Sequence, residues 1–424
     1  MSHSGPMTEP AVPRRTLSLR SRWSVPVAVA ALVAGAFIAP PLIASAGDRG
    51  LPPVTPEQLL AQVAAAQPTA LSGTVVYTAR LGLPEIPFAS AGGADPIVLL
   101  GGSSTMRVWS DGADRSRVAL LGATSEYSVV RDGAQAWTYS SADDAAVHYA
   151  LSAADAARYD KLSSDLRATT ESPAAGALPT PEDAARAALA HADTTSVVTL
   201  DAQTTVAGRA AYQLVVTPRS TDTLVARIVV AIDAVTSTPL RVQAWSTQDT
   251  TAPALELGFT DVRFATPDPS VLAFSAPAGA TVKEVVVPLP DKSAMVSPAP
   301  APTPGTLPDG VSVTGTGWAT VVTLAHVDVA SLVAGDPAAL TGALGTRPTI
   351  GSESAQGLIQ EFGPSDGKGP GDKFTLDTAA LYQQLTTEVP EGRLLSSALV
   401  SVLVTTDGRV LIGAVPAETL RGMA

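Results

Sequence analysis

Hydrophobic and polar residues alternate along many stretches of this chain, the first of them beginning at residue 71. In the segment LSGTVVYTAR the apolar positions are Leu71, Val75, Tyr77 and Ala79, and the polar positions between them are Ser72, Thr74, Thr78 and Arg80. Successive side chains of a strand point to opposite faces of the sheet. The segment is therefore predicted to be an antiparallel strand with one buried face and one solvated face.

The same alternation recurs often enough to predict about ten strands before residue 290. The further strands fall near 106–109, 115–121, 127–130, 136–139, 197–200, 211–217, 226–233, 240–245, 255–264 and 282–287. Asp-Gly pairs at 111–112 and 132–133 separate strand-like segments, and Asp-Gly favours a tight hairpin turn. The pattern indicates one large, strongly curved antiparallel sheet.

One helical signal precedes this β pattern, and two more interrupt it. Thr55, Pro56 and Gln58 stand at the positions of an N-cap, a first-turn proline and a capping-box partner. Further helices are predicted from Ser152 and from Thr180 to about residue 192. Helices lying across the concave side of a curved sheet would enclose an apolar cavity, but the pattern by itself favours the alternative, in which the same apolar face is a filled core.

A proline-rich segment divides the chain into two domains. Residues 297–308 read SPAPAPTPGTLP, which is typical of a semi-extended linker. We place a sheet domain at 50–290, the linker at 291–308 and a smaller α+β domain at 309–424. The smaller domain is predicted to have strands at 317–327, 398–405 and 409–415 and a helix from Asp377 to about residue 388. The overall class is α+β.

The N-terminus has the features of an export signal. Residues 1–23 contain four arginines, residues 24–46 are uncharged and mostly apolar, and the apolar run closes with Ala44-Ser45-Ala46. This order predicts a basic cytoplasmic tail followed by a signal peptide or a transmembrane anchor. The rest of the chain is then extracytoplasmic, either secreted or anchored to the membrane through its N-terminal segment.

Charge and cysteine content narrow the function. The net charge is −12, and the first 46 residues contribute +3 from four Arg and one Glu, so the remainder carries −15. A domain this acidic repels phosphate backbones, and nucleic acid is not an expected partner. Because the chain has no cysteine, disulfides, thiolate metal ligands and thiol catalysis are excluded.

Motifs for catalysis are missing from the sequence. The four histidines (His3, His148, His191 and His326) form no metal-binding pattern, and no G-x-S-x-G elbow occurs. Residues 363–368 are one residue short of a phosphate-binding loop, and Gly369 stands where Ser or Thr would hold magnesium. We therefore expect no enzyme activity, no cofactor and no metal site.

Several ordered segments resemble one superfamily. LSGTVVYTARLGLP at 71–84, the Asp-Gly hairpins that follow, GRAAYQLVVTP at 208–218 and VAIDAVTSTPLRV at 230–242 are similar to the superfamily of the lipoprotein carrier LolA and the sigma-E regulator RseB. The resemblance implies a half-barrel with a helical lid over a hydrophobic pocket. The segment after the linker resembles the second domain of RseB-type proteins, which implies a two-domain RseB-like protein of actinobacterial type.

Two functions are then expected. In the first, the protein binds the acyl chain of a lipid or lipoprotein in the half-barrel without catalysis, and the predicted ligand-binding residues are Val75, Tyr77, Met106, Val108, Ile228, Val230, Leu257 and Phe259. In the alternative, it is an RseB-like interaction module that acts on a membrane regulatory protein, an anti-sigma factor.

Overall fold

The computed structural model describes residues 50–84, 93–94, 96–159, 161, 194–287, 310–333 and 378–424. The basic tail at 1–23, the apolar segment at 24–46, the helix expected at 180–192 and the linker at 291–308 lie outside these ranges. Within them, no helix combines the length and the apolar character needed to cross a membrane.

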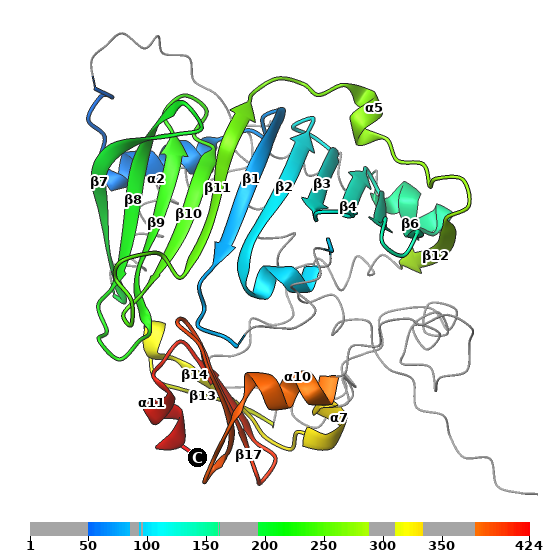
Figure 1. Ribbon diagram of the computed structural model, residues 1–424. Helices are drawn as coiled ribbons and strands as arrows, with labels where there is room; N and C mark the ends of the chain where they lie inside the picture. Colours follow the sequence, from blue (N-terminus) through cyan, green and yellow to red (C-terminus); the bar gives the residue numbers. More distant parts are fainter. Residues whose placement is uncertain are drawn as a thin grey trace, which may run out of the picture.

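Twelve strands form one large curved sheet, as predicted (Figure 1). Their order across the sheet is β12-β6-β5-β4-β3-β2-β1-β11-β10-β9-β8-β7. The strands are β1 (Leu71–Ala79), β2 (Gly102–Ser110), β3 (Arg115–Leu121), β4 (Glu126–Asp132), β5 (Gln135–Ser140), β6 (Ala145–Leu151), β7 (Ser196–Val206), β8 (Arg209–Pro218), β9 (Val225–Asp233), β10 (Pro239–Ser246), β11 (Leu255–Arg263) and β12 (Thr281–Val287).

The sheet differs from the prediction at one edge. Strand β6 was not expected, because its sequence AAVHYAL is rich in alanine and lacks a polar and apolar alternation. Strand β12 pairs with β6 in parallel, whereas the other neighbouring strands of this sheet are antiparallel. A parallel pair needs a long connection, which the segments between residues 151 and 281 supply.

The first described helix, α2 (Pro56–Ala65), begins where the sequence predicts. The Thr55 side chain accepts a hydrogen bond from the Gln58 backbone N–H (3.3 Å), and the Gln58 side chain accepts one from the Thr55 backbone N–H (3.0 Å). This capping box satisfies two backbone donors that would otherwise have no partner. Leu59 of α2 is buried against Tyr212 and Ile232, so the helix covers β8 and β9.

Residues 310–333 and 378–424 form a second, smaller sheet with its own helices, which we call the second domain. Its sheet has the strand order β13-β14-β18-β17-β16-β15, and helix α11 covers it. The elements are β13 (Val311–Thr314), η3 (Gly317–Ala319), β14 (Val321–Leu324), α7 (Val329–Val333), α10 (Thr378–Leu385), β15 (Thr387–Val389), β16 (Gly392–Ser396), β17 (Ser401–Thr405), β18 (Val410–Gly413) and α11 (Ala417–Arg421).

The strand predicted at 317–327 is interrupted in the structure. Gly315 and Gly317 both adopt positive φ (82° and 57°), a backbone region that glycine enters at low cost. They turn the chain into the short helix η3, so only 321–324 remain extended. The core of this domain is formed by Val321, Leu403, Leu411, Val415 and Leu420, all at most 1% exposed.

Candidate functional site

The two faces of the large sheet differ in charge. The strand register places Val75, Met106 and Leu257 on one face, which we call the inner face. Among the described strand positions from β12 across to β10, the charged side chains that share this face are Arg131 and Lys283. Over the same strands, the charged residues of the opposite, outer face are Arg107, Arg115, Arg117, Glu126, Asp132, Arg241, Glu256, Asp261, Arg263 and Glu284.

Six of the eight predicted ligand-binding residues lie together on the inner face. One apolar cluster contains Val75, Tyr77, Met106, Val108, Leu257 and Phe259. Ala94, and Leu99 from the short helix η2 (Pro96–Leu100), pack against this cluster. The other two residues lie elsewhere on the sheet: Val230 packs beneath α2, and Ile228 lies at the contact with the second domain.

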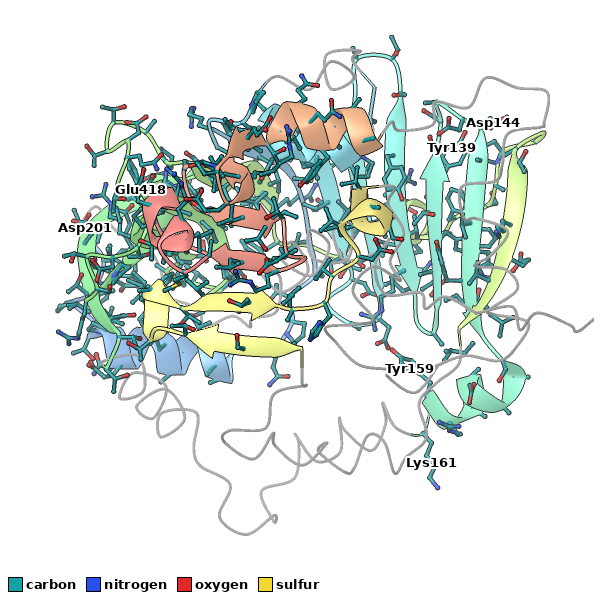
Figure 2. The ribbon with its side chains drawn as sticks, turned by 90° about the horizontal axis from the view of Figure 1, so that it is seen from below. Tyr139, Asp144, Tyr159, Lys161, Asp201 and Glu418 are labelled. Carbon is teal, nitrogen blue, oxygen red and sulfur yellow. The ribbon has the colours of Figure 1, made fainter. Side chains whose placement is uncertain are left out.

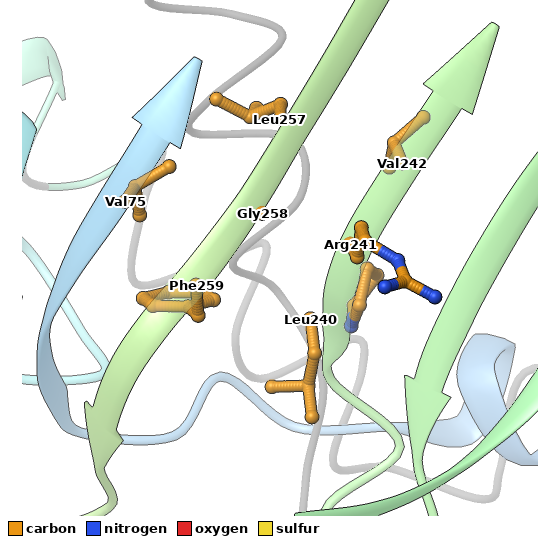
Figure 3. A pocket seen from close by; sticks show the side chains of 8 residues that line it. Val75, Leu240, Arg241, Val242, Leu257, Gly258 and Phe259 are labelled. Atoms are coloured by element: carbon orange, nitrogen blue, oxygen red, sulfur yellow. The ribbon is translucent and has the colours of Figure 1, made fainter. Parts of the chain in front are cut away.

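The side chains of this cluster differ in how accessible they are. Val75, Met106 and Val108 are each 2% exposed, whereas Tyr77 and Leu257 are only half-buried. A void of about 10 Å³ adjoins Val75, Leu257 and Phe259 (Figure 3), which is room for about one water molecule. A ligand that reaches Val75 or Phe259 therefore has to displace side chains that already pack there.

The inner face continues across β3 to β6 with residues that sequence analysis did not single out. Val118, Tyr127, Val129 and Tyr149 lie on this face and are half-buried. Their position follows from alternation once the register is known. What the sequence could not supply was the strand register that assigns these residues to the face of Val75, and for Tyr149 the strand β6 itself was not recognised.

Two phenols of this face are harder to ionise than an exposed tyrosine. Burial raises the pKa of Tyr77, and burial together with the neighbouring Tyr127 raises the pKa of Tyr149. Desolvation disfavours the charged form of an acid, so a raised pKa is its expected result. These tyrosines remain neutral at physiological pH and offer an apolar ring with one hydroxyl each.

The outer face has a wider hollow of about 670 Å³ beside the β3–β4 turn. Tyr139, Phe274 and Pro277 line it together with the ion pair between Arg117 and Glu126 (2.9 Å). Burial by itself raises the pKa of the Glu126 carboxyl, but hydrogen bonds from Ser128 and Arg117 outweigh it and lower this pKa. The hollow is thus mixed in character, unlike the inner face.

Acidic and aromatic groups also meet beside this hollow. The Tyr139 hydroxyl donates to Asp144 Oδ1 at 3.3 Å, and the two side chains lie close together in Figure 2. The ring of Phe274 lies 5.8 Å from that of Tyr139 at an interplanar angle of 45°. Tilted aromatic pairs at this separation are favourable contacts. Asp144 lies in the turn between β5 and β6.

The histidine of β6 has a local structural role. His148 Nδ1 lies 2.6 Å from Glu284 Oε2, and Nε2 lies 3.2 Å from Gln135 Oε1. Its ring stacks on Trp137 with centroids 3.9 Å apart. These contacts join β12 to β6 and β5. In the part of the chain that the structure describes, no three His, Asp or Glu side chains are grouped as metal ligands would be.

No protein-family profile matches this chain, and no curated protein matches it. Among solved structures, it is similar to the MucA/MucB complex of Pseudomonas aeruginosa, at 17% identity over 86% of this chain and 94% of that chain, with a TM-score of 0.35. It is similar to an uncharacterized conserved protein of Thermus thermophilus, at 15% identity over 51% of this chain and 90% of that chain, with a TM-score of 0.28.

A LolA superfamily protein of Nitrosomonas europaea is also similar, at 12% identity over 52% of this chain and 99% of that chain, with a TM-score of 0.19. Both groups that the sequence motifs resemble, the RseB type and the LolA type, are among these matches.

Proposed function

We propose that this chain is a non-catalytic, extracytoplasmic binding protein that holds the acyl chain of a lipid or lipoprotein against the inner face of its large sheet. The observation that carries the proposal is the segregation of charge between the two faces of that sheet. From β12 to β10 the inner face has two charged strand positions, Arg131 and Lys283, so it offers hydrocarbon a wide apolar contact area. Each methylene buried there contributes about 0.8 kcal/mol.

The half-buried side chains indicate where a ligand first makes contact. Tyr77, Val118, Tyr127 and Leu257 are reachable without rearrangement of the fully buried cluster. A longer ligand would extend toward Val75 by displacing the side chains of Ala94 and Leu99. The N-terminal apolar segment, cleaved or retained, would bring this domain to the outer side of the membrane, where such ligands are found.

A charge introduced on the inner face tests the proposal. Tyr77→Asp places a carboxylate among apolar side chains, while Thr78→Asp places one on the opposite face of the same strand. Binding is measured by titration with a fluorescent fatty acid, and lipids carried by protein from its native membrane are identified by mass spectrometry. We expect at least tenfold weaker binding by Tyr77→Asp and wild-type binding by Thr78→Asp.

Two results would contradict acyl binding. One is wild-type protein that carries no lipid and binds no fatty acid. The other is equal loss of binding in both variants, which would mean that the inner face is not the site. Circular dichroism establishes that each variant is folded before its binding is compared.

The second candidate function is an interaction module for a membrane regulatory protein. The hollow beside Tyr139 and Phe274 favours it, because aromatic rings next to an ion pair suit a polypeptide segment better than a hydrocarbon chain. A photo-crosslinking residue at position 274 tests it, with exposed Val197 as the control position. Absence of a crosslinked membrane regulator, or unchanged envelope-stress transcription after deletion, would contradict this function.

A further inference from the structure

The inner face is built from rows of side chains that run across the strands. The register of β1, β11, β10 and β9 aligns one row through Tyr77 and the next row through Ala79. The first row consists of Tyr77, Leu257, Val242 and Val230, and the second consists of Ala79, Leu255, Ala244 and Ile228. Two residues of a strand advance the chain by about 6.6 Å, so the rows lie roughly that far apart.

The second domain closes the inner face just beyond the second row. Leu399, 7% exposed, forms an apolar cluster with side chains of both domains. Members of that cluster from the large sheet and its loops are Leu81, Val225, Ile228, Ala244, Ala254 and Leu255, and members from the second domain are Trp318, Ala398, Leu399 and Ala414. Figure 1 shows the second domain at the end of β1 that leads to residue 81.

Hydrogen bonds fix the second domain at this end of the sheet. The Ala398 backbone N–H donates to the Leu81 carbonyl (2.8 Å), and the Ser246 hydroxyl donates to the Ala398 carbonyl (2.6 Å). Trp318 Nε1 donates to Ser196 Oγ (2.8 Å). Because these bonds hold both flanks of the apolar cluster, Leu399 and Trp318 have defined positions relative to the second row.

We propose that Leu399 and Trp318 form the end wall of the acyl-binding face and set the longest acyl chain that it accepts. This inference rests on the proposed acyl-binding function. A hydrocarbon chain lying along the inner face past the Tyr77 row meets the Ala79 row and then Leu399. A methylene beyond this point has no room, so the affinity for fatty acids stops rising once the acyl chain is long enough to reach the second domain.

Substitutions that move the wall test this proposal with the full chain. Leu399→Ala has a smaller side chain and leaves more space for the end of an acyl chain. Leu399→Phe has a larger side chain and leaves less. Affinities for laurate, myristate, palmitate, stearate and arachidate are measured by displacement of a fluorescent fatty acid. We expect Leu399→Ala to favour longer acids, by about fourfold for each methylene newly accommodated, and Leu399→Phe to favour shorter ones.

Val400 supplies the matched control, because it is the next residue and its side chain is 38% exposed. Val400→Ala should keep the wild-type length profile. If Leu399→Ala does not fold, two other variants still test the end wall. Leu399→Phe makes the wall residue larger, and Trp318→Phe changes the second residue of the wall. Wild-type binding with a length profile that no wall variant shifts would overturn the end wall and leave acyl binding standing. Failure of the wild type to bind any of the acids would overturn both.

Discussion

Asp233, at the end of β9, connects the β9–β10 turn to the β7–β8 hairpin. Its side chain is 1% exposed and forms an ion pair with Arg209, in which Arg209 Nη2 lies 2.9 Å from Asp233 Oδ1. Oδ1 also accepts hydrogen bonds from the Val235 N–H (3.0 Å), the Thr236 N–H (2.7 Å) and the Thr236 hydroxyl (2.9 Å). Asp233→Ala removes the common acceptor of all these donors.

Asp233→Ala is expected to lower the free energy of unfolding by about 3 kcal/mol. This value is at the lower end of the range for breaking a buried ion pair, about 3–5 kcal/mol. Removal of the Asp233 carboxylate leaves two backbone donors without an acceptor. The Arg209 side chain is 29% exposed and regains some hydration, so the cost falls at that lower end. Guanidinium unfolding followed by circular dichroism at pH 7 measures the difference.

The pH dependence gives a second measure of the same interaction. Burial alone raises the pKa of Asp233, but the hydrogen bonds from Arg209 and Thr236 and the Arg209 charge outweigh it and lower this pKa. A lowered pKa in the folded state stabilises the protein above the unfolded pKa, and this stability is lost as the pH falls through the folded pKa. The stability gap between wild type and Asp233→Ala should therefore be constant from pH 7 to 5 and shrink below about pH 4.

The control for this prediction is Asp132→Ala. The Asp132 side chain is 55% exposed and pairs with Arg115 at 3.3 Å, so its loss should cost less than about 1 kcal/mol. A loss in Asp233→Ala no larger than that in Asp132→Ala would refute the reasoning. So would a gap between wild type and Asp233→Ala that does not change with pH.

Three further predictions concern the elements that position the inner face. Gly73→Ala should destabilise the sheet by about 1–3 kcal/mol, because an added Cβ would lie 2.8 Å from the Phe259 ring and closer still to backbone; thermal unfolding measures it. Ser196→Ala should cost about 1–3 kcal/mol by leaving the Trp318 indole N–H without its acceptor, and should shift the tryptophan emission. Thr55→Ala should cost about 1 kcal/mol through loss of the capping box, seen as faster amide exchange in α2.

Much of the secondary structure of this protein follows from its sequence alone. The alternation in LSGTVVYTAR predicts β1 and the face shared by Val75 and Tyr77, because the period of a strand is fixed by backbone geometry. The residues Thr55 and Gln58 predict the start of α2 for the same local reason. The proline-rich segment predicts two domains, since such composition does not pack into a core.

The tertiary structure decided what depends on contacts distant in the sequence. Alternation assigns a residue to one of two faces, but pairing of strands decides which face is shared, so Val118, Tyr127 and Tyr149 were found only through the register. Ile228 lies apart from Met106 because β1, β11 and β10 stand between β9 and β2 in the sheet, and the second domain docks beside Ile228. Docking of one domain on another depends on two surfaces fitting together, and no periodicity within either segment records that fit.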